Sequence, residues 1–153
     1  METQMKKGVD YTGVTVCFAC HDGKGNFIFC KRSIRCRDEH GMWDAGGGGV
    51  DFGDSVEETL KKEIAEEYCT DVLAYEFLGY RDLFREQDGR KTHWVTLDFK
   101  VLVDRSKVRN GEPHKFDDLQ WFTLDKLPAP MHSAWPAFFN KNKEKLLELT
   151  PTA

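Results

Sequence analysis

The stretch that decides the fold runs from Gly46 to Thr70 and reads GGGGVDFGDSVEETLKKEIAEEYCT. A run of glycines leads through a short loop into a helix start. There Ser55 is the expected N-cap, and Glu58, three residues later, completes a capping box. Apolar residues then recur at every fourth position, namely Val56, Leu60, Ile64 and Tyr68. This periodicity predicts an amphipathic helix over Val56–Tyr68.

Three carboxylates of this helix, those of Glu63, Glu66 and Glu67, share one arc of its surface if each residue turns the helix by about 100°. The arc overlaps the apolar stripe of Val56 and Leu60, so Glu67 is expected beside buried side chains. An unpaired anion in such a place is costly. Like charges at this spacing also repel one another and raise each other's pKa values unless a cation lies among them.

The ordinary alternative is a solvated acidic helix that is stabilised by ion pairs four residues apart. The spacing predicts two such pairs, Glu57–Lys61 and Glu58–Lys62. They account for those four residues but leave Glu67 without a partner. Hard divalent cations take oxygen ligands, and Mg²⁺ is commonly held by a few carboxylates together with substrate phosphates. The helix therefore predicts a metal-binding platform.

The same residues resemble the Nudix box, whose consensus is G-x5-E-x7-R-E-U-x-E-E-x-G-U, with U a bulky apolar residue. Gly48 and the three carboxylates match this pattern. Four positions depart from it. Asp54 replaces the Glu of the consensus, Lys62 replaces the Arg, Cys69 replaces the Gly, and Thr70 replaces the last apolar residue. The flanks also fit, namely Trp43 before the glycines and, later in the chain, Leu119–Phe122 and Leu127–Pro128.

The resemblance implies a single α/β (α+β) domain over residues 1–153, with a mixed β-sheet between α-helices. It also implies divalent metal ions, Mg²⁺ or Mn²⁺, bound by Glu66, Glu67 and the carbonyl of Gly47. Glu63 would be a further ligand or the base that activates water. Lys62 takes the place of the arginine that orients a box glutamate, and a lysine offers a point charge in place of a planar fork.

For the reaction, the resemblance implies hydrolysis of a phosphoanhydride in a nucleoside diphosphate derivative. The segment Gly111–Lys115, followed by Trp121–Phe122, is similar to the smaller Nudix enzymes that convert nucleoside triphosphates to monophosphates and pyrophosphate. Hydrolysis of ADP-ribose or of a dinucleoside polyphosphate is the alternative, as is a nucleotide-binding module without catalysis. Candidate substrate-binding residues are Arg32, Trp94 and Glu112; a solvated loop arginine, a core tryptophan and a solvated loop glutamate are the ordinary alternatives.

Composition narrows the class of protein further. The chain of 153 residues is 40% hydrophobic and 31% charged, which is typical of a globular domain. Its net charge of −4 argues against binding of a nucleic-acid polymer. No run approaches the roughly 20 apolar residues of a membrane span. Five cysteines without a signal peptide favour reduced thiols and a cytoplasmic location. The sequence does not decide between a monomer and a homodimer.

Outside the box, apolar runs predict strands at Tyr11–Cys20, Asn26–Arg32, Val72–Tyr80 and His93–Val103 and a short one through Trp121. The first two form a hairpin around the turn at residues 21–25. A polar loop is expected over Phe84–Lys91, and a last helix over Ser133–Leu149. Residues 17–21 read C-x-x-C-H, the haem-attachment pattern. On a strand, however, Cys17 and Cys20 point to opposite faces, which argues against attachment to one ring.

Overall fold

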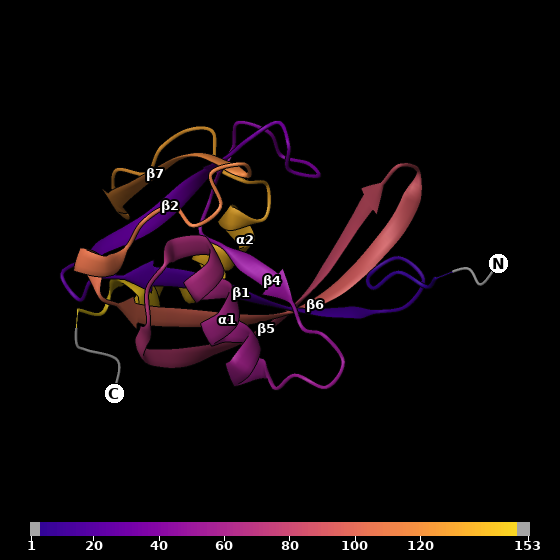
Figure 1. Ribbon diagram of the computed structural model, residues 1–153, viewed down its shortest axis with the longest axis horizontal. Coiled ribbons are helices and arrows are strands. Elements are labelled where there is room, and N and C mark those ends of the chain that lie inside the picture. The colour runs from indigo at the N-terminus through magenta and orange to yellow at the C-terminus, as the bar shows by residue number, and fades with distance from the viewer. Residues whose placement is uncertain (1–3, 150–153) are drawn as a thin grey trace.

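Seven strands form one sheet in a computed structural model that describes residues 4–149 (Figure 1). In chain order the elements are β1 Gly13–His21, β2 Asn26–Arg32, β3 Trp43–Asp44, β4 Gly47–Gly49, α1 Val56–Tyr68, β5 Val72–Gln87, β6 Arg90–Val103, a 3₁₀ turn Arg105–Lys107, β7 Phe116–Thr123 and α2 Trp135–Leu147. The main path is β3-β2-β1-β6-β5, while β4 pairs with β1 and β7 with β2. The pair β1–β6 is parallel and the other pairs are antiparallel, so the sheet is mixed.

Each face of the sheet packs against one helix. Because successive side chains of a strand point to opposite faces, β1 contributes to two separate cores. One core joins strand residues to α1 through Leu60, Ile64 and Tyr68. The other joins strand residues to α2 through Trp135 and Phe138. The predicted architecture, a mixed sheet between helices, is confirmed.

The predicted helix start is also confirmed. The Ser55 hydroxyl accepts a hydrogen bond from the Glu58 N–H, and the Glu58 carboxylate accepts one from the Ser55 N–H, each at 3.1 Å. Of the two expected ion pairs, Glu57–Lys61 forms at 3.1 Å. The prediction of an ion pair between Glu58 and Lys62 was wrong, because Glu58 closes the capping box while the Lys62 ammonium lies 3.9 Å from the Asp51 carboxylate.

The helix ends at Cys69 in a left-handed conformation, with φ 58° and ψ 26°. Its N–H donates to the Ala65 carbonyl at 3.1 Å, which closes the last turn. A side chain with a Cβ is strained in this region of backbone space, and glycine is not. We therefore expect Cys69→Gly to stabilise the fold by about 1 kcal/mol or less, as measured by urea unfolding. A clearly destabilised variant would contradict this and show that the thiol contributes packing.

The prediction of a polar loop over Phe84–Lys91 was wrong. These residues continue β5 and β6 into a long hairpin, which extends away from the body of the molecule in Figure 1. The turn is the pair Asp88 and Gly89, whose φ angles are 51° and 78°. Asp-Gly with two positive φ values is a favoured two-residue hairpin turn. The Asp-Gly pair therefore predicts a hairpin more strongly than the polarity of the flanking residues predicts a loop.

The remaining boundaries lie close to the predicted ones. Strand β2 has the predicted bounds, β1 is shifted by one or two residues, and α2 is two residues shorter at each end. Cys20 packs in the core under α1 and Cys17 against the core under α2, so the two thiols point to opposite faces as expected. All five cysteines are free. Within residues 4–149 no helix is long and apolar enough to cross a membrane.

Candidate active site

The glycine segment lies directly against two carboxylates of α1. A Cβ added to Gly48 would lie 2.2 Å from the Glu63 carboxyl carbon, and one added to Gly46 would lie 2.8 Å from Oε2 of Glu67. Gly46 also has a φ of 125°, which side chains with a Cβ rarely adopt. Glycine is therefore required at positions 46 and 48, because the backbone approaches these two carboxylates so closely.

Glu67 is the most unusual side chain of this site. It is only 7% exposed, and its Oε2 has no hydrogen-bond partner within residues 4–149. Burial raises the pKa of its carboxyl well above the usual range, and the nearby charges of Asp44 and Glu63 raise it further. A buried carboxylate oxygen without a partner is costly, so the site provides an oxygen ligand that a cation can use.

Glu63 and Glu66 lie on the same side of α1 but differ in exposure. Glu63 is half-buried, and burial followed by the charge of Glu66 raises the pKa of its carboxyl. Glu66 is exposed. Lys62 is also exposed, and its closest carboxylate is that of Asp51. Its charge acts on Glu63 only as a secondary effect that lowers the pKa, so the structure does not place it in a direct ion pair with a box glutamate.

The loop that carries Glu112 is fastened to the end of α1. The N–H of Gly111 donates to the Glu67 carbonyl at 3.0 Å, and a Cβ at Gly111 would lie 2.0 Å from the Glu66 carbonyl oxygen. The Glu112 side chain is 16% exposed and pairs with Lys115 at 3.1 Å. Its charge contributes to the raised pKa values of both Glu63 and Glu67. Glu112 thus faces the carboxylates of α1, and the solvated alternative does not apply.

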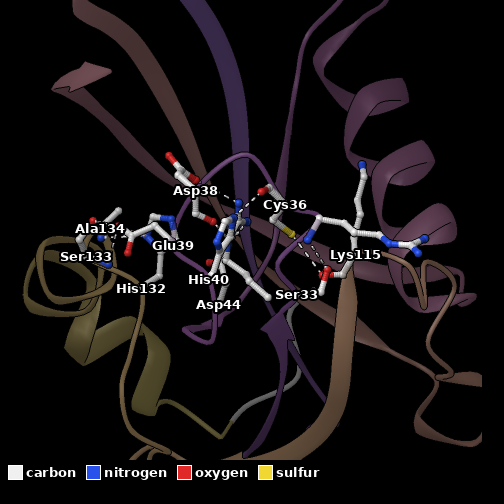
Figure 2. Close-up of polar contacts among 12 residues, drawn as sticks. Ser33, Cys36, Asp38, Glu39, His40, Asp44, Lys115, His132, Ser133 and Ala134 are labelled. Carbon is white, nitrogen blue, oxygen red and sulfur yellow. Dashed lines mark hydrogen bonds and ion pairs between the residues drawn. The ribbon is translucent and has the colours of Figure 1, made fainter. Parts of the chain in front are cut away.

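The segment between β2 and β3 contacts the loop that carries Glu112 and also holds Arg32 in place (Figure 2). The Ser33 hydroxyl donates to the His114 carbonyl at 2.7 Å, and the Cys36 thiol donates to the Lys115 carbonyl at 3.1 Å. The same segment fixes Arg32, whose guanidinium contacts the carboxylates of Asp38 at 3.1 Å and Asp44 at 3.5 Å.

A cavity of about 340 Å³ opens beside Glu67, and residues of both cores line it, with Phe18 and Cys30 from the core under α1 and Trp135 and Phe138 from the core under α2. Four of the eight predicted catalytic, metal-binding and substrate-binding residues line it, namely Arg32, Gly47, Glu67 and Trp94. Glu63, Glu66, Lys62 and Glu112 are not among its lining residues. The Trp94 ring also covers Gly8 and Gly13, where an added Cβ would lie within 2.6 Å of it. It is therefore both a packing residue and part of the cavity wall.

The carboxylates around Glu67 provide oxygen donors that could hold a divalent cation. Within residues 4–149, no three His, Cys, Asp or Glu side chains are already gathered around one metal position. Nevertheless, the unpartnered oxygen of Glu67 and the mutual repulsion of Glu63, Glu67 and Glu112 are features that a bound cation would relieve. These oxygen donors suit Mg²⁺ or Mn²⁺, and the residues present therefore fit such an ion.

Some residues of the site were not identified from the sequence. Asp44 and Lys115 both act on the charge of Glu67, and Gly46 makes room for its oxygen. Asp44 directly follows Trp43 on β3, and Lys115 follows Glu112 by three residues, so only proximity in sequence could have suggested them. Gly46 could have been inferred from the glycine run, which contains two more glycines than the motif residue Gly48 and its preceding residue Gly47.

Known proteins match this chain in both sequence and structure. The NUDIX domain family matches residues 11–142. Nucleoside triphosphatase NudI from strains of Escherichia coli is 31% identical over 110 residues, which cover 67% of this chain and 77% of that protein. The NudI protein of Shigella flexneri matches equally.

Solved structures agree with the fold. A MutT NUDIX hydrolase from Burkholderia pseudomallei superimposes with a TM-score of 0.75 at 28% identity, covering 85% of this chain and 97% of that chain. The NUDIX domain of Shewanella oneidensis NrtR, in complex with ADP ribose, has a TM-score of 0.69 at 20% identity, with 93% and 90% covered. The family match spans most of the chain and includes the glycine segment, α1 and both cores, and we conclude that this chain belongs to the NUDIX family of hydrolases, which act on pyrophosphate bonds.

Proposed function

We propose that this protein is a Mg²⁺-dependent or Mn²⁺-dependent pyrophosphohydrolase that converts a nucleoside triphosphate to the monophosphate and pyrophosphate. The observation that carries the proposal is the buried, unpartnered Oε2 of Glu67 beside the glycine segment and the cavity. The relatedness to NudI, a nucleoside triphosphatase, supports the choice of a triphosphate. A cavity of about 340 Å³ lies at the lower end of the usual range for small-molecule sites.

The residues divide into two roles in this proposal. Glu66, Glu67 and the Gly47 carbonyl hold the divalent ions, which when bound neutralise negative charge on the phosphate oxygens and lower the pKa of water. Glu63 accepts a proton from the attacking water or acts as a further ligand. Glu112 faces the same carboxylates and is the second candidate for this proton transfer.

Electrostatic contacts around the site would hold the substrate and these carboxylates. Lys115 lies beside Glu112 and partly offsets the negative charge at Glu63 and Glu67. Arg32 lines the cavity and is held by Asp38 and Asp44, so its guanidinium is fixed close to the position proposed for the phosphates. A fixed guanidinium orients phosphate oxygens better than a mobile one, because less conformational freedom is lost on binding.

A turnover screen tests the proposal. The purified protein is incubated with Mg²⁺ and, in separate reactions, with each ribo- and deoxyribonucleoside triphosphate, ADP-ribose and a dinucleoside tetraphosphate. Products are separated by anion exchange. We expect nucleoside monophosphate and pyrophosphate in equal amounts from at least one triphosphate, without free phosphate. A much higher kcat/KM for ADP-ribose or the dinucleotide than for every triphosphate would contradict the assignment of the substrate.

A further inference from the structure

An ion pair between two adjacent strands lies at the end of the cavity under α2. The Arg81 side chain from β5 is 11% exposed, and the Asp98 side chain from β6 is fully buried. Nε and Nη2 of Arg81 donate to the two carboxylate oxygens of Asp98 at 2.6 and 3.0 Å. Arg81 lines the cavity, and its guanidinium carbon lies 5.4 Å from the centre of the Phe138 ring.

The ion pair leaves hydrogen-bond donors free at one end of the guanidinium. Asp98 accepts from Nε and one N–H of Nη2, and the Cys17 side chain takes a further hydrogen bond, so two of the five N–H groups of Arg81 remain. Nη1 and Nη2 together present two parallel donors, a geometry that suits two adjacent acceptors. Cys17, also in the cavity wall, is the polar neighbour of Arg81 on β1.

Stability alone is a weak reason for such a pair. Removing two charges from water costs several kcal/mol, and apolar side chains of similar volume often stabilise a fold as well or better. An arginine that is held rigidly by a buried carboxylate has a fixed direction, however, and a fixed fork recognises partners with matching geometry. The fully buried Asp98 therefore acts as a positioning residue for the Arg81 donors.

Strand register places Asp98, which holds this fork, two strands away from the glycine segment. Cys17 on β1 is paired with Gly47 of β4 on one side and with Asp98 of β6 on the other. Neighbouring strands lie about 4.8 Å apart, so Gly47 and Asp98 are separated by roughly 10 Å. A nucleotide with its phosphates at Gly47 would extend its nucleoside toward Arg81. The rings of Trp135 and Phe138 line the same end and offer an apolar wall for a flat base.

We propose that Arg81, held by Asp98, selects the nucleobase by donating two hydrogen bonds to a pair of adjacent acceptors. Guanine offers such a pair at O6 and N7, and cytosine at O2 and N3. Adenine and uracil or thymine place an N–H donor next to each acceptor, so one of the two Arg81 donors would face another donor. The substrates would therefore be guanine and cytosine nucleotides. This inference rests on the proposed function for the direction in which the nucleotide lies in the cavity.

Binding of nucleoside monophosphates tests the inference independently of which bond is cleaved. Dissociation constants of GMP, CMP, AMP and UMP are measured in Mg²⁺ by the fluorescence of the cavity tryptophans. Because a bidentate contact to a base discriminates by about tenfold or more, we expect GMP and CMP to bind at least about tenfold tighter than AMP and UMP. 7-Deaza-GMP, which lacks the N7 acceptor, is expected to lose most of the advantage of GMP.

Two variants of the pair and one control complete the test. Arg81→Met combined with Asp98→Leu removes both charges and avoids leaving one buried alone, and Arg81→Lys keeps the charge but lacks the fork. In both variants, the dissociation constants of the four nucleotides are expected to differ by no more than about twofold. Arg105→Gln removes an exposed arginine that pairs with Asp22 at 2.9 Å outside the cavity, and it is expected to keep the ranking.

Equal binding of the four monophosphates by the wild type, or an unchanged ranking in Arg81→Lys, would overturn the inference. Uniformly weaker binding in that variant, without a change in ranking, would overturn it too and would show that Arg81 contacts phosphate. If triphosphates are hydrolysed without any preference for the base, the inference fails while the proposed function stands. If GMP and CMP bind selectively but no triphosphate is hydrolysed, the proposed function fails and the selection by Arg81 stands.

Discussion

Glu67→Gln is expected to lower kcat/KM for the hydrolysis of the preferred triphosphate by about two orders of magnitude or more. The variant keeps the shape of the side chain but removes the charge that we assign to metal binding, and electrostatic stabilisation of the reacting phosphate is usually the largest contribution to such catalysis. Initial rates at saturating Mg²⁺ measure the effect. Glu57→Gln is the matched control, because Glu57 lies on the same helix but is exposed and pairs with Lys61. It is expected to change the rate by less than about twofold.

The same variant has an opposite effect on the stability of the metal-free protein. The pKa of Glu67 is raised in the folded state above the ordinary value of 4.5. The folded state therefore holds this proton more tightly than the unfolded state, and the wild type in chelator loses stability as the pH rises above about 4.5 toward the folded-state pKa. Glutamine has no such proton. Glu67→Gln is thus expected to melt at a higher temperature than the wild type in chelator at pH 8.

Addition of Mg²⁺ should reverse that order of melting temperatures. Millimolar Mg²⁺ stabilises the wild type by mass action, because the folded state binds the ion and the unfolded state does not. The gain is expected to be clearly smaller in Glu67→Gln. Identical melting temperatures of the wild type in Mg²⁺ and in chelator would contradict a metal site shared by these carboxylates.

Gly48→Ala is the second substitution for which we expect a large loss of activity. Its new Cβ would lie 2.2 Å from the Glu63 carboxyl carbon, so Glu63 has to move away from the glycine segment. Displacement of a catalytic group by about 1 Å can cost about 100-fold in rate, which is the loss expected in kcat/KM. Gly48 does not have a positive φ, and Glu63 can adopt another rotamer. The melting temperature in chelator should therefore change little.

Gly49→Ala is the control for this substitution. The nearest atom to its new Cβ would be the Lys7 ammonium nitrogen at 3.4 Å, and Gly49 also lacks a positive φ. We expect its kcat/KM to stay within about threefold of the wild type. Equal activities of the two alanine variants would show that the close contact between Gly48 and Glu63 does not position the carboxylate.

Local patterns were sufficient to predict the centre of the fold. The capping box at Ser55 and the apolar recurrence from Val56 to Tyr68 depend on neighbouring residues, and the structure has both as expected. The hairpin over Phe84–Lys91 was missed because the polarity of its strands was given more weight than the turn-forming pair Asp88–Gly89. These strands are polar because they extend beyond the part of the sheet that the helices cover.

The two ends of the site differ in how far the sequence could predict them. Glu63, Glu66 and Glu67 lie within one helical turn, so their common arc follows from helix geometry. The pair Arg81–Asp98 joins residues on neighbouring strands that are 17 positions apart, and its place in the cavity depends on α2, more than 30 positions further along the chain. Strand register and helix docking bring such residues together, and neither can be read from a single sequence.

Calorimetric titration of Mn²⁺ into the metal-free protein at pH 7.5 tests most directly whether the Glu67 cluster is a metal site. The account predicts saturable binding accompanied by proton release that grows as the pH of the titration is lowered from 7.5, since burial and neighbouring carboxylates raise the pKa of Glu67 and a bound cation displaces its proton. Repeating the titration in buffers of different ionisation enthalpy measures this release. Both the binding and the proton release should be strongly reduced in Glu67→Gln. Absence of binding to the wild type, or undiminished binding with the same proton release in the variant, would contradict the account.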